Sequence, residues 1–257
     1  MIEALYECDM RPDMFVGTSV GAINAAFLAS RPPTVQTARE LQRIWRGMSR
    51  GRIFPANPVT VGLGLLGMRD HSVPIGSLRR LVREHVQVDR LEHTATPLHV
   101  LAADLVGGEE VLLSIGPAVE AILASAAIPG VFPAVPWETR KLVDGGVLNN
   151  TPISHAVALG AERIVVLPAV GTERLRRLPR GPFASGAAAL SRAIGRRLAD
   201  DLNRYQDQAE MIVLPAPAVG GILPTDFAHT EELIAEAVRR SRVTLAGERR
   251  AHLRLAA

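Results

Sequence analysis

The sequence predicts an α/β fold in which a layered sheet carries helices on both faces. Short apolar runs such as residues 163–167 have the length and composition of buried strands. Helix-like segments such as residues 37–48, whose apolar residues recur on one helical stripe, alternate with these runs. Strands that alternate with helices form a sheet between helical layers. Because the 257 residues are 47% apolar, we expect one domain with a sizeable core over residues 1–257.

The elements expected before residue 90 follow from apolar spacing and helix propensity. Apolar residues at i, i+3 and i+4 make residues 1–6 helix-like. The run 13–16 is interpreted as a short buried strand, and the helix formers of residues 22–29 as the helix that follows it. Amphipathic spacing predicts two further helices, at residues 37–48 and 77–85.

The middle of the chain contains a hairpin signal and a helix stop. Gly107 and Gly108 separate two strand-like runs, residues 97–105 and 109–114, which predicts a hairpin. Residues 118–127 are helix-like, and a proline at position 129 ends that helix.

The last third of the chain continues the alternation. A helix at residues 152–159 is closed by Gly160, and residues 163–167 are expected to be a buried parallel strand. Residues 169–183 are interpreted as an exposed loop. It is followed by a helix at 187–210, a strand at 211–214 and a terminal helix at 230–246.

Ser19 is the best candidate for a nucleophile, because it is the central residue of a G-x-S-x-G run between the first strand and its helix. Such a run forms a sharp strand-to-helix turn that lifts the serine hydroxyl towards substrate. Gly17 and Gly21 lack a Cβ, so we expect them to allow a close approach of backbone and helix. The Val20 N–H would point from the helix N-terminus at developing negative charge. The alternative is a tight turn in which Ser19 merely caps the helix.

Asp144 is the candidate carboxylate. It follows the strand-like run Lys141-Leu142-Val143 and precedes Gly145 and Gly146, which would let another backbone or a substrate come close. The alternative is a plain turn, since Asp-Gly is a common turn signal without any function.

Three separated motifs together resemble the bacterial patatin-like phospholipase family. They are the run from Gly17 to Ala25, the run Ala124-Ser125-Ala126-Ala127-Ile128-Pro129-Gly130-Val131-Phe132-Pro133, and Asp144-Gly145-Gly146 with Asn150-Thr151-Pro152. The resemblance covers most of residues 1 to about 215. It implies a three-layer patatin-like fold with a mostly parallel central sheet. It also implies a dyad of Ser19 and Asp144, without histidine, metal or cofactor, that hydrolyses acyl esters of lipids.

The same resemblance identifies a missing element. Family members open with a strand and a G-G-G-x-x-G loop whose N–H groups build the oxyanion hole, and no such loop precedes Ser19. Each lost oxyanion donor typically costs about a hundredfold to a thousandfold in turnover. We expect the working protein to be longer than this chain. The alternative is a natural departure with impaired catalysis, acting as a binding or regulatory protein.

Two other sets of catalytic residues remain open as alternatives to the pair of Ser19 and Asp144. A Ser–Asp–His order would instead indicate an α/β-hydrolase triad, for which His229 is the best placed histidine in the sequence. His155 follows Asp144 closely on an expected helix and is interpreted as a capping or packing residue. Asp104 is the chief competitor of Asp144, because it ends an expected strand.

The segment Gly62-Leu63-Gly64-Leu65-Leu66-Gly67 matches the dinucleotide-binding pattern literally. It lacks the strand and helix that this pattern requires, so we expect no dinucleotide. The segment is interpreted as an apolar flap near the active site or as a glycine-rich surface loop.

Charge and cysteine content limit the remaining classes. Cys8 is the single cysteine, so no disulfide forms within the chain. The net charge is +3 and Lys141 is the single lysine, so the basic residues are almost all arginine. With 4% aromatic residues and no aromatics among the basic runs, we expect no nucleic-acid partner.

The arginines cluster in three runs, which we interpret as solvated helix faces that can also attract an anionic membrane surface. The runs are Arg174, Arg176, Arg177 and Arg180; Arg192, Arg196 and Arg197; and Arg239, Arg240 and Arg242. No signal peptide pattern and no apolar run of membrane-spanning length occurs, so we expect a cytoplasmic protein with peripheral membrane contact.

Overall fold

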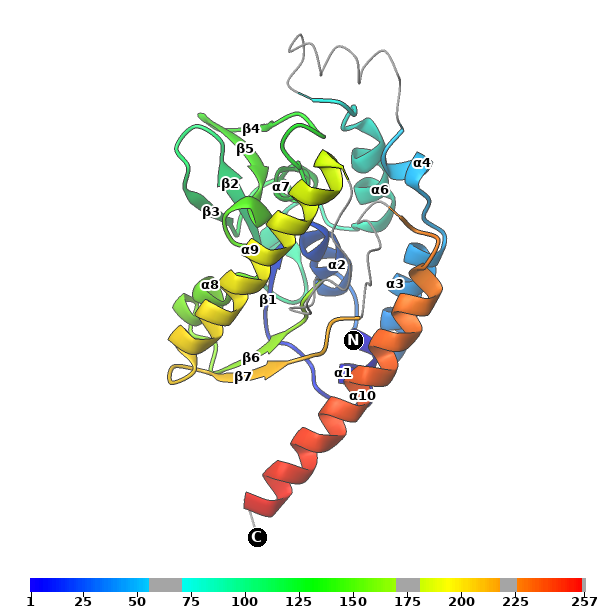
Figure 1. Cartoon of the computed structure of the whole chain (residues 1–257), viewed down its shortest axis with the longest axis vertical. Coiled ribbons are helices and arrows are strands. Elements are labelled where there is room, and N and C mark those ends of the chain that lie inside the picture. Colours follow the sequence, from blue (N-terminus) through cyan, green and yellow to red (C-terminus); the bar gives the residue numbers. More distant parts are fainter. Residues whose placement is uncertain (56–70, 170–180, 218–225, 256–257) are drawn as a thin grey trace. The chain divides into compact units, whose positions relative to one another are not determined.

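The computed structural model describes residues 1–55, 71–169, 181–217 and 226–255 (Figure 1). The 62–67 segment and most of the 169–183 loop lie outside these residues. Residue contacts divide the chain into two compact units, of which unit 1 comprises Met1–Arg11, Pro33–Gly47 and Ala156–Ala257. Unit 2 comprises Pro12–Pro32 and Met48–His155. The single domain over the whole chain stays a prediction.

Unit 2 is built on a mixed five-stranded sheet. Its central strand is β2 (Leu98–Asp104), most of whose residues are buried. β1 (Phe15–Thr18) pairs with β2 in parallel, and β3 (Glu110–Leu113) and β5 (Arg140–Asp144) pair with it antiparallel. β4 (Val135–Trp137) extends the sheet by pairing antiparallel with β5.

β1 and β5 lie end to end along one edge of β2. β1 pairs with residues 98–101 and β5 with residues 102–104. β3 pairs with residues 100–103, overlapping both stretches, so it must occupy the opposite edge. Because β1 runs parallel and β5 antiparallel to β2, their carboxyl ends converge: Thr18 is opposite Leu101, and Asp144 is opposite Ala102. The residue after β1 and the last residue of β5 are therefore neighbours.

Helices of small residues cover this sheet. α2 (Val20–Ala29) packs on β1 and β2, α7 (Ala118–Ser125) packs on β2 and β5, and the two helices contact each other (Figure 1). Alanine makes up four of the seven buried residues of α2 and three of the six of α7, which lets helix and strand backbones approach closely. The other helical segments among the described residues of unit 2 are α4 (Arg50–Ile53), α6 (Gly76–His85) and two short 3-10 turns, η1 (Leu91–His93) and η2 (Gly145–Val147).

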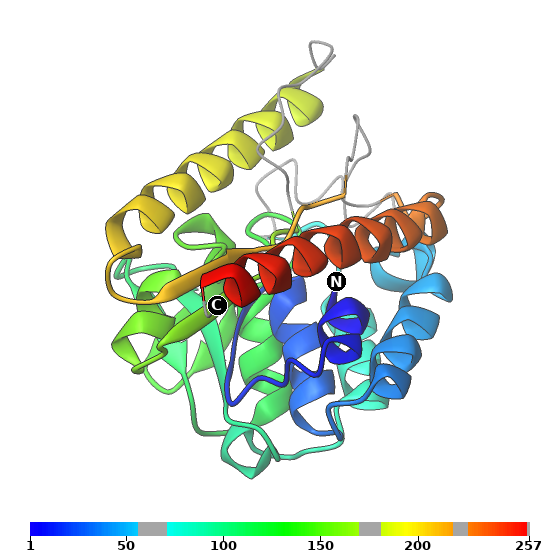
Figure 2. The same ribbon diagram turned by 90° about the horizontal axis from the view of Figure 1, so that it is seen from below.

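Unit 1 combines long helices with a two-stranded parallel sheet. The strands are β6 (Arg163–Val166) and β7 (Glu210–Val213), joined through α9 (Pro182–Tyr205). The other helices are α1 (Ile2–Glu7), α3 (Val35–Arg46) and α10 (Thr230–Leu255), and α8 (Ile153–Ala158) crosses the boundary between the units. Figure 2 shows α10 running past α1, with which it is in contact.

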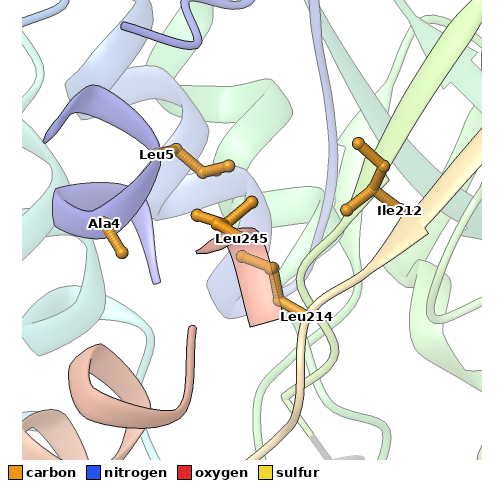
Figure 3. Packing of buried hydrophobic residues seen from close by; sticks show 5 residues of the cluster. All are labelled: Ala4, Leu5, Ile212, Leu214 and Leu245. Carbon is orange, nitrogen blue, oxygen red and sulfur yellow. The ribbon is translucent and has the colours of Figure 1, made fainter. Parts of the chain in front are cut away.

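The core of unit 1 joins its helices to its sheet. Ala4 and Leu5 from α1, Leu245 from α10, and Ile212 and Leu214 from β7 and the residue after it form one buried cluster (Figure 3). These side chains come from the two ends of the chain, so the first helix of the chain is held by its last.

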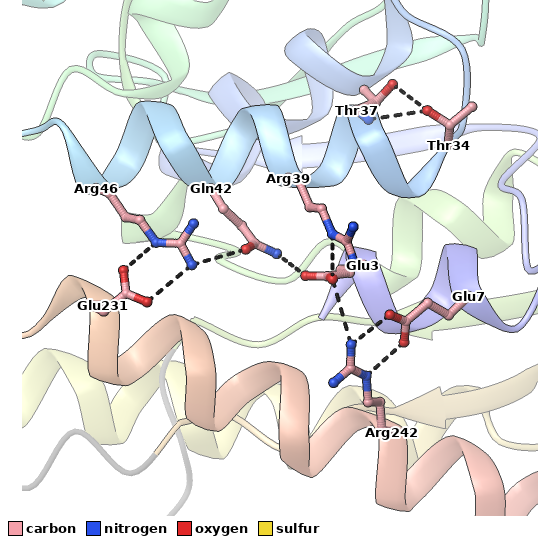
Figure 4. A network of polar contacts seen from close by, with 9 residues as sticks. All are labelled: Glu3, Glu7, Thr34, Thr37, Arg39, Gln42, Arg46, Glu231 and Arg242. Atoms are coloured by element: carbon pink, nitrogen blue, oxygen red, sulfur yellow. Dashed lines mark hydrogen bonds and ion pairs between the residues drawn. The ribbon is translucent and has the colours of Figure 1, made fainter.

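A polar network around Glu3 lies among the helices of the same unit (Figure 4). The Glu3 carboxylate is buried and accepts hydrogen bonds from Arg39 at 3.0 Å and Gln42 at 2.6 Å, while Arg242 lies 3.6 Å away. Arg242 also donates twice to Glu7, at 2.6 and 2.7 Å. α1, α3 and α10 are therefore tied by charge as well as by apolar contact.

The arginine runs are partly engaged in such pairs. Arg197 donates to Asp201 at 3.0 Å and Arg240 to the carbonyl of Ala216 at 2.7 Å. The run from Arg174 to Arg180 lies outside the described residues. No helix in the described ranges combines the length and the apolarity needed to cross a membrane.

Most expected elements are present with shifted ends, and the differences have physical reasons. The helix predicted at 187–210 begins at Pro182, where a proline suits the first turn, and ends at Tyr205. The terminal helix extends to Leu255 instead of ending near residue 246. β4 was not predicted because it contains Pro136, which the outermost strand of a sheet tolerates.

Candidate active site

Ser19 lies in a sharp turn between β1 and α2. Its φ of 55° and ψ of −127° belong to a region that non-glycine residues rarely adopt. Such a conformation costs of the order of 1–3 kcal/mol and persists only where the surroundings enforce it. The side chain of Ser19 makes no capping hydrogen bond to α2, so the interpretation of Ser19 as a simple helix cap is wrong.

The two glycines of the turn have different surroundings. A Cβ on Gly17 would lie 2.8 Å from the Ala22 Cα and from the Gly21 carbonyl oxygen, so strand and helix backbones touch there. A Cβ on Gly21 would meet no described atom within 4 Å. The Gly17 position thus has no room for a side chain, whereas the Gly21 position opens on free space although the Gly21 backbone takes part in the contact with Gly17.

The hydroxyl of Ser19 points at Asp144. Its Oγ donates a hydrogen bond to Asp144 Oδ2 at 2.5 Å. The other carboxylate oxygen, Oδ1, accepts from the Gly146 N–H at 2.8 Å, and the Asp144 side chain is oriented by this bond. Asp144 is only 5% exposed. A nucleophile and a carboxylate that are 125 residues apart in sequence are thus in direct contact.

Burial changes the acidity of this carboxyl group. It raises the pKa of Asp144 from 3.8 to about 6, because the charged form loses hydration. The hydrogen bonds from Ser19 and from the Gly146 N–H lower the pKa and so limit the rise. Asp144 is still mostly ionised at pH 7, but it is a stronger base than a carboxylate in water.

Gly145 and Gly146 are required by the close packing around Asp144. A Cβ on Gly145 would lie 2.5 Å from the Leu101 carbonyl oxygen, a distance that no side chain can occupy. A Cβ on Gly146 would lie 2.8 Å from Asn150 Oδ1 and 3.0 Å from Asp144 Oδ1. Gly145 thus allows the loop after β5 to pass directly over β2, whereas Gly146 leaves room for the side chains of Asn150 and Asp144.

A second set of polar contacts ties the Ser19 turn to the loop after Asp144. The Thr18 hydroxyl donates to the Asn149 carbonyl at 3.2 Å. Asn149 is fully buried, and its amide donates to Glu110 at 3.0 Å, while His155 Nε2 lies 2.7 Å from the same Glu110 oxygen. His155 is therefore a packing residue paired with Glu110, as its position predicted. The sequence offered no signal for Glu110.

Asp104 and His229, the other candidates for a catalytic role, have different partners. Asp104 accepts from the Val106 N–H at 3.0 Å and lies 3.9 Å from Arg140, so it stabilises the β2–β3 turn. His229 lies 3.6 Å from Glu232 in the first turn of α10, within unit 1. Within unit 2, no described histidine is hydrogen-bonded to Ser19 or Asp144.

Three exposed apolar residues lie close to the pair, two of them along the chain and one through a backbone hydrogen bond. Val20 follows Ser19, Val147 lies three residues after Asp144, and Ile128 follows Ala127, whose carbonyl accepts from the Asp144 N–H at 2.9 Å. Val20 is also the first residue of α2, so its N–H has no acceptor within the helix. Among the described residues, no group of three or more His, Cys, Asp or Glu side chains is arranged to hold a metal ion.

Fold and site together define an α/β protein with a serine–carboxylate pair at a strand-to-helix turn. Residues 1–157 match the family described as patatin-like phospholipase. This match covers more than half of the chain, and the chain belongs to the patatin-like phospholipase family. The predicted family and its three-layer α/β fold class are therefore confirmed.

Curated relatives agree with this family. The chain is 32% identical over 157 residues to the uncharacterized NTE family protein Rv2565 of Mycobacterium tuberculosis, covering 58% of this chain and 24% of the relative. It is 34% identical over 92 residues to the uncharacterized NTE family protein Rv1063c of the same organism, covering 36% of this chain and 26% of the relative. Patatin-like phospholipase domain-containing protein 7 of Mus musculus is 23% identical over 172 residues, 65% of this chain and 12% of the relative. The chain thus spans about a quarter of the length of these mycobacterial relatives.

Proposed function

We propose that the chain is a lipid acyl hydrolase that uses Ser19 as nucleophile and Asp144 as its base. The observation that carries the proposal is the 2.5 Å hydrogen bond from Ser19 Oγ to Asp144 Oδ2. The raised pKa of Asp144, about 6, supports it, because a desolvated carboxylate accepts a proton from an alcohol more readily than one in water.

The reaction proceeds in two steps. Ser19 Oγ attacks the ester carbonyl carbon while its proton passes to Asp144 Oδ2. The bond to the leaving alcohol then breaks, Asp144 returns the proton to that alcohol, and an acyl-enzyme remains. In the second step a water oxygen attacks the acyl carbon while Asp144 takes a proton from that water. The bond between the acyl carbon and Ser19 Oγ then breaks, Asp144 returns the proton to Oγ, and the acid is released.

Local features favour acyl esters as substrates. Val20, the residue after Ser19, opens α2, and its N–H can donate to the oxyanion that forms on the substrate carbonyl oxygen when Ser19 attacks, because a helix N-terminus stabilises negative charge. The exposed apolar residues Val20, Ile128 and Val147 offer a surface for an acyl chain. The family of the chain points to the same substrate class.

Hydrolysis of p-nitrophenyl butyrate by the full chain tests the proposal. Ser19→Ala and Asp144→Asn should each lower kcat by at least about a thousandfold. Ser241→Ala is the matched control, because Ser241 is buried and its hydroxyl has no hydrogen-bond partner among the described residues. Full activity of Ser19→Ala would refute the proposal. Activity that survives in Asp144→Asn but not in Ser19→Ala would keep Ser19 as the nucleophile and exclude Asp144 as its base.

A fluorophosphonate probe separates an enzyme from a binding protein of the same fold. The probe should label the wild-type chain and the Ser241→Ala control, and should leave Ser19→Ala unlabelled. A folded wild-type chain that neither labels nor hydrolyses the ester would instead be a binding or regulatory protein.

A further inference from the structure

The hydroxyl of Ser125 connects the strained turn to the central strand. Ser125 is the last residue of α7 and is fully buried. Its Oγ accepts a hydrogen bond from the Ser19 N–H at 2.8 Å and donates one to the Leu101 carbonyl at 2.6 Å. The Ser125 side chain thus links the backbone N–H of Ser19, just after β1, to the backbone carbonyl of Leu101 in β2.

The position of this bridge follows from the sheet. Thr18, the last residue of β1, is opposite Leu101, so Ser19 is the first residue that leaves the β1–β2 ladder. The Ser125 hydroxyl stands between the Ser19 N–H and the Leu101 carbonyl, where it takes the place of a ladder hydrogen bond. The ladder is extended by one residue although the backbone has already turned away.

We propose that Ser125 is a positioning residue that holds Ser19 in its strained conformation and so keeps Oγ aligned with Asp144. The inference rests on the proposed function. Without the hydroxyl, the Ser19 N–H and the Leu101 carbonyl lose a shared partner in a buried site, and nothing replaces the bond that opposes relaxation of φ at Ser19. Ser125 acts through Ser19 alone, because its donor and its acceptor positions both serve the backbone and no solvent reaches it.

The first variant to measure is Ser125→Ala in the full chain, with Ser241→Ala as the control for removal of a buried serine hydroxyl. Ser125→Ala should lower kcat for p-nitrophenyl butyrate by about tenfold to a hundredfold with KM within about twofold, as expected when a reacting atom is misplaced. The rate of labelling by fluorophosphonate should fall by a similar factor. Ser241→Ala should keep both rates. A folded Ser125→Ala chain with unchanged kcat would overturn the proposal.

An isosteric pair removes the effect of the cavity. Ser125→Thr keeps the hydroxyl and Ser125→Val replaces it with a methyl group of the same shape. The threonine variant should therefore exceed the valine variant in kcat by at least tenfold at equal folded fraction. Equal kcat in the two variants would assign any loss to packing and refute a role for the hydrogen bonds.

Amide hydrogen exchange in the wild-type chain tests the bridge without any substitution. The Ser19 N–H should exchange as slowly as the amides of β2, because it is held in a buried hydrogen bond. Exchange as fast as that of exposed loop amides would overturn the proposal. If the wild-type chain is inactive while its Ser19 N–H is protected, the proposed function fails and the bridge itself stands, so the two failures are distinguishable.

Discussion

Replacement of Asp144 by asparagine should abolish activity and at the same time stabilise the folded chain at neutral pH. Asparagine has nearly the shape of the protonated acid, and its Oδ1 can still accept from the Gly146 N–H. The variant therefore keeps the packing and removes the buried charge. A substitution in the site that raises stability would indicate that the carboxylate is held there at an energetic cost.

The magnitude follows from the pKa of Asp144. Burial raises it from 3.8 to about 6, which is about two units, and one unit corresponds to about 1.36 kcal/mol. Ionisation of Asp144 therefore destabilises the folded state by about 3 kcal/mol. The folded chain binds the proton more tightly than the unfolded one, so this cost is absent below pH 3.8 and fully present once the pH exceeds about 6. About half of it should disappear between pH 8 and pH 5.

The assay is urea unfolding of the wild-type chain and Asp144→Asn at pH 8, 6.5 and 5. Other groups titrate alike in both chains, so the difference in unfolding free energy isolates Asp144. The variant should be more stable at pH 8, and its advantage should shrink as the pH falls. An advantage that is independent of pH, or a variant that is less stable at pH 8, would refute the reasoning.

Three further predictions follow from the same structure. The kcat/KM for an ester should fall about tenfold per unit below pH 6, because the proposed proton acceptor is the ionised form of Asp144; a flat profile down to pH 5 would exclude this carboxylate as the base. Gly17→Ala should lower the free energy of unfolding by about 1–3 kcal/mol through backbone overlap, whereas Gly21→Ala, in open space, should change it by less than about 1 kcal/mol; thermal melting checks the pair. The double variant Arg39→Met and Arg242→Met leaves the buried Glu3 carboxylate without its two arginine partners and should lower the free energy of unfolding by about 3 kcal/mol. Glu3→Gln should lower it by less, because the arginines that it leaves behind are half exposed and can be hydrated. Chemical denaturation of the variants checks this order.

The sequence predicted the class of fold because local patterns were strong. Three elements begin and end within about two residues of their expected bounds. They are the helix after the G-x-S-x-G turn, the hairpin around Gly107 and Gly108, and the amphipathic helix expected at 37–48. The sequence did not predict which strands pair with one another. That β1 and β5 share one edge of β2 depends on long-range register, which no local window contains.

The two principal candidates of the site were predictable, and their supports were not. Ser19 and Asp144 carry recognisable turn chemistry, and the structure places them in hydrogen-bond contact. Ser125 lies within a run that the sequence analysis identified as a motif. Its partners are the Ser19 N–H and the Leu101 carbonyl, and because every residue carries such backbone groups, the residue types could not predict these contacts. Glu110 interacts across the sheet and is visible only once β3 is placed.

The convergence of β1 and β5 on β2 also sets an order of events in folding. The pair of Ser19 and Asp144 closes a separation of 125 residues, and contacts so distant in sequence form late because the chain must first lose the entropy of a long loop. Neither side chain can meet the other until both strands have docked on β2. Recovery of the proposed ester hydrolysis after denaturation should therefore lag behind recovery of helical circular dichroism, so that the return of activity would report when the sheet is complete.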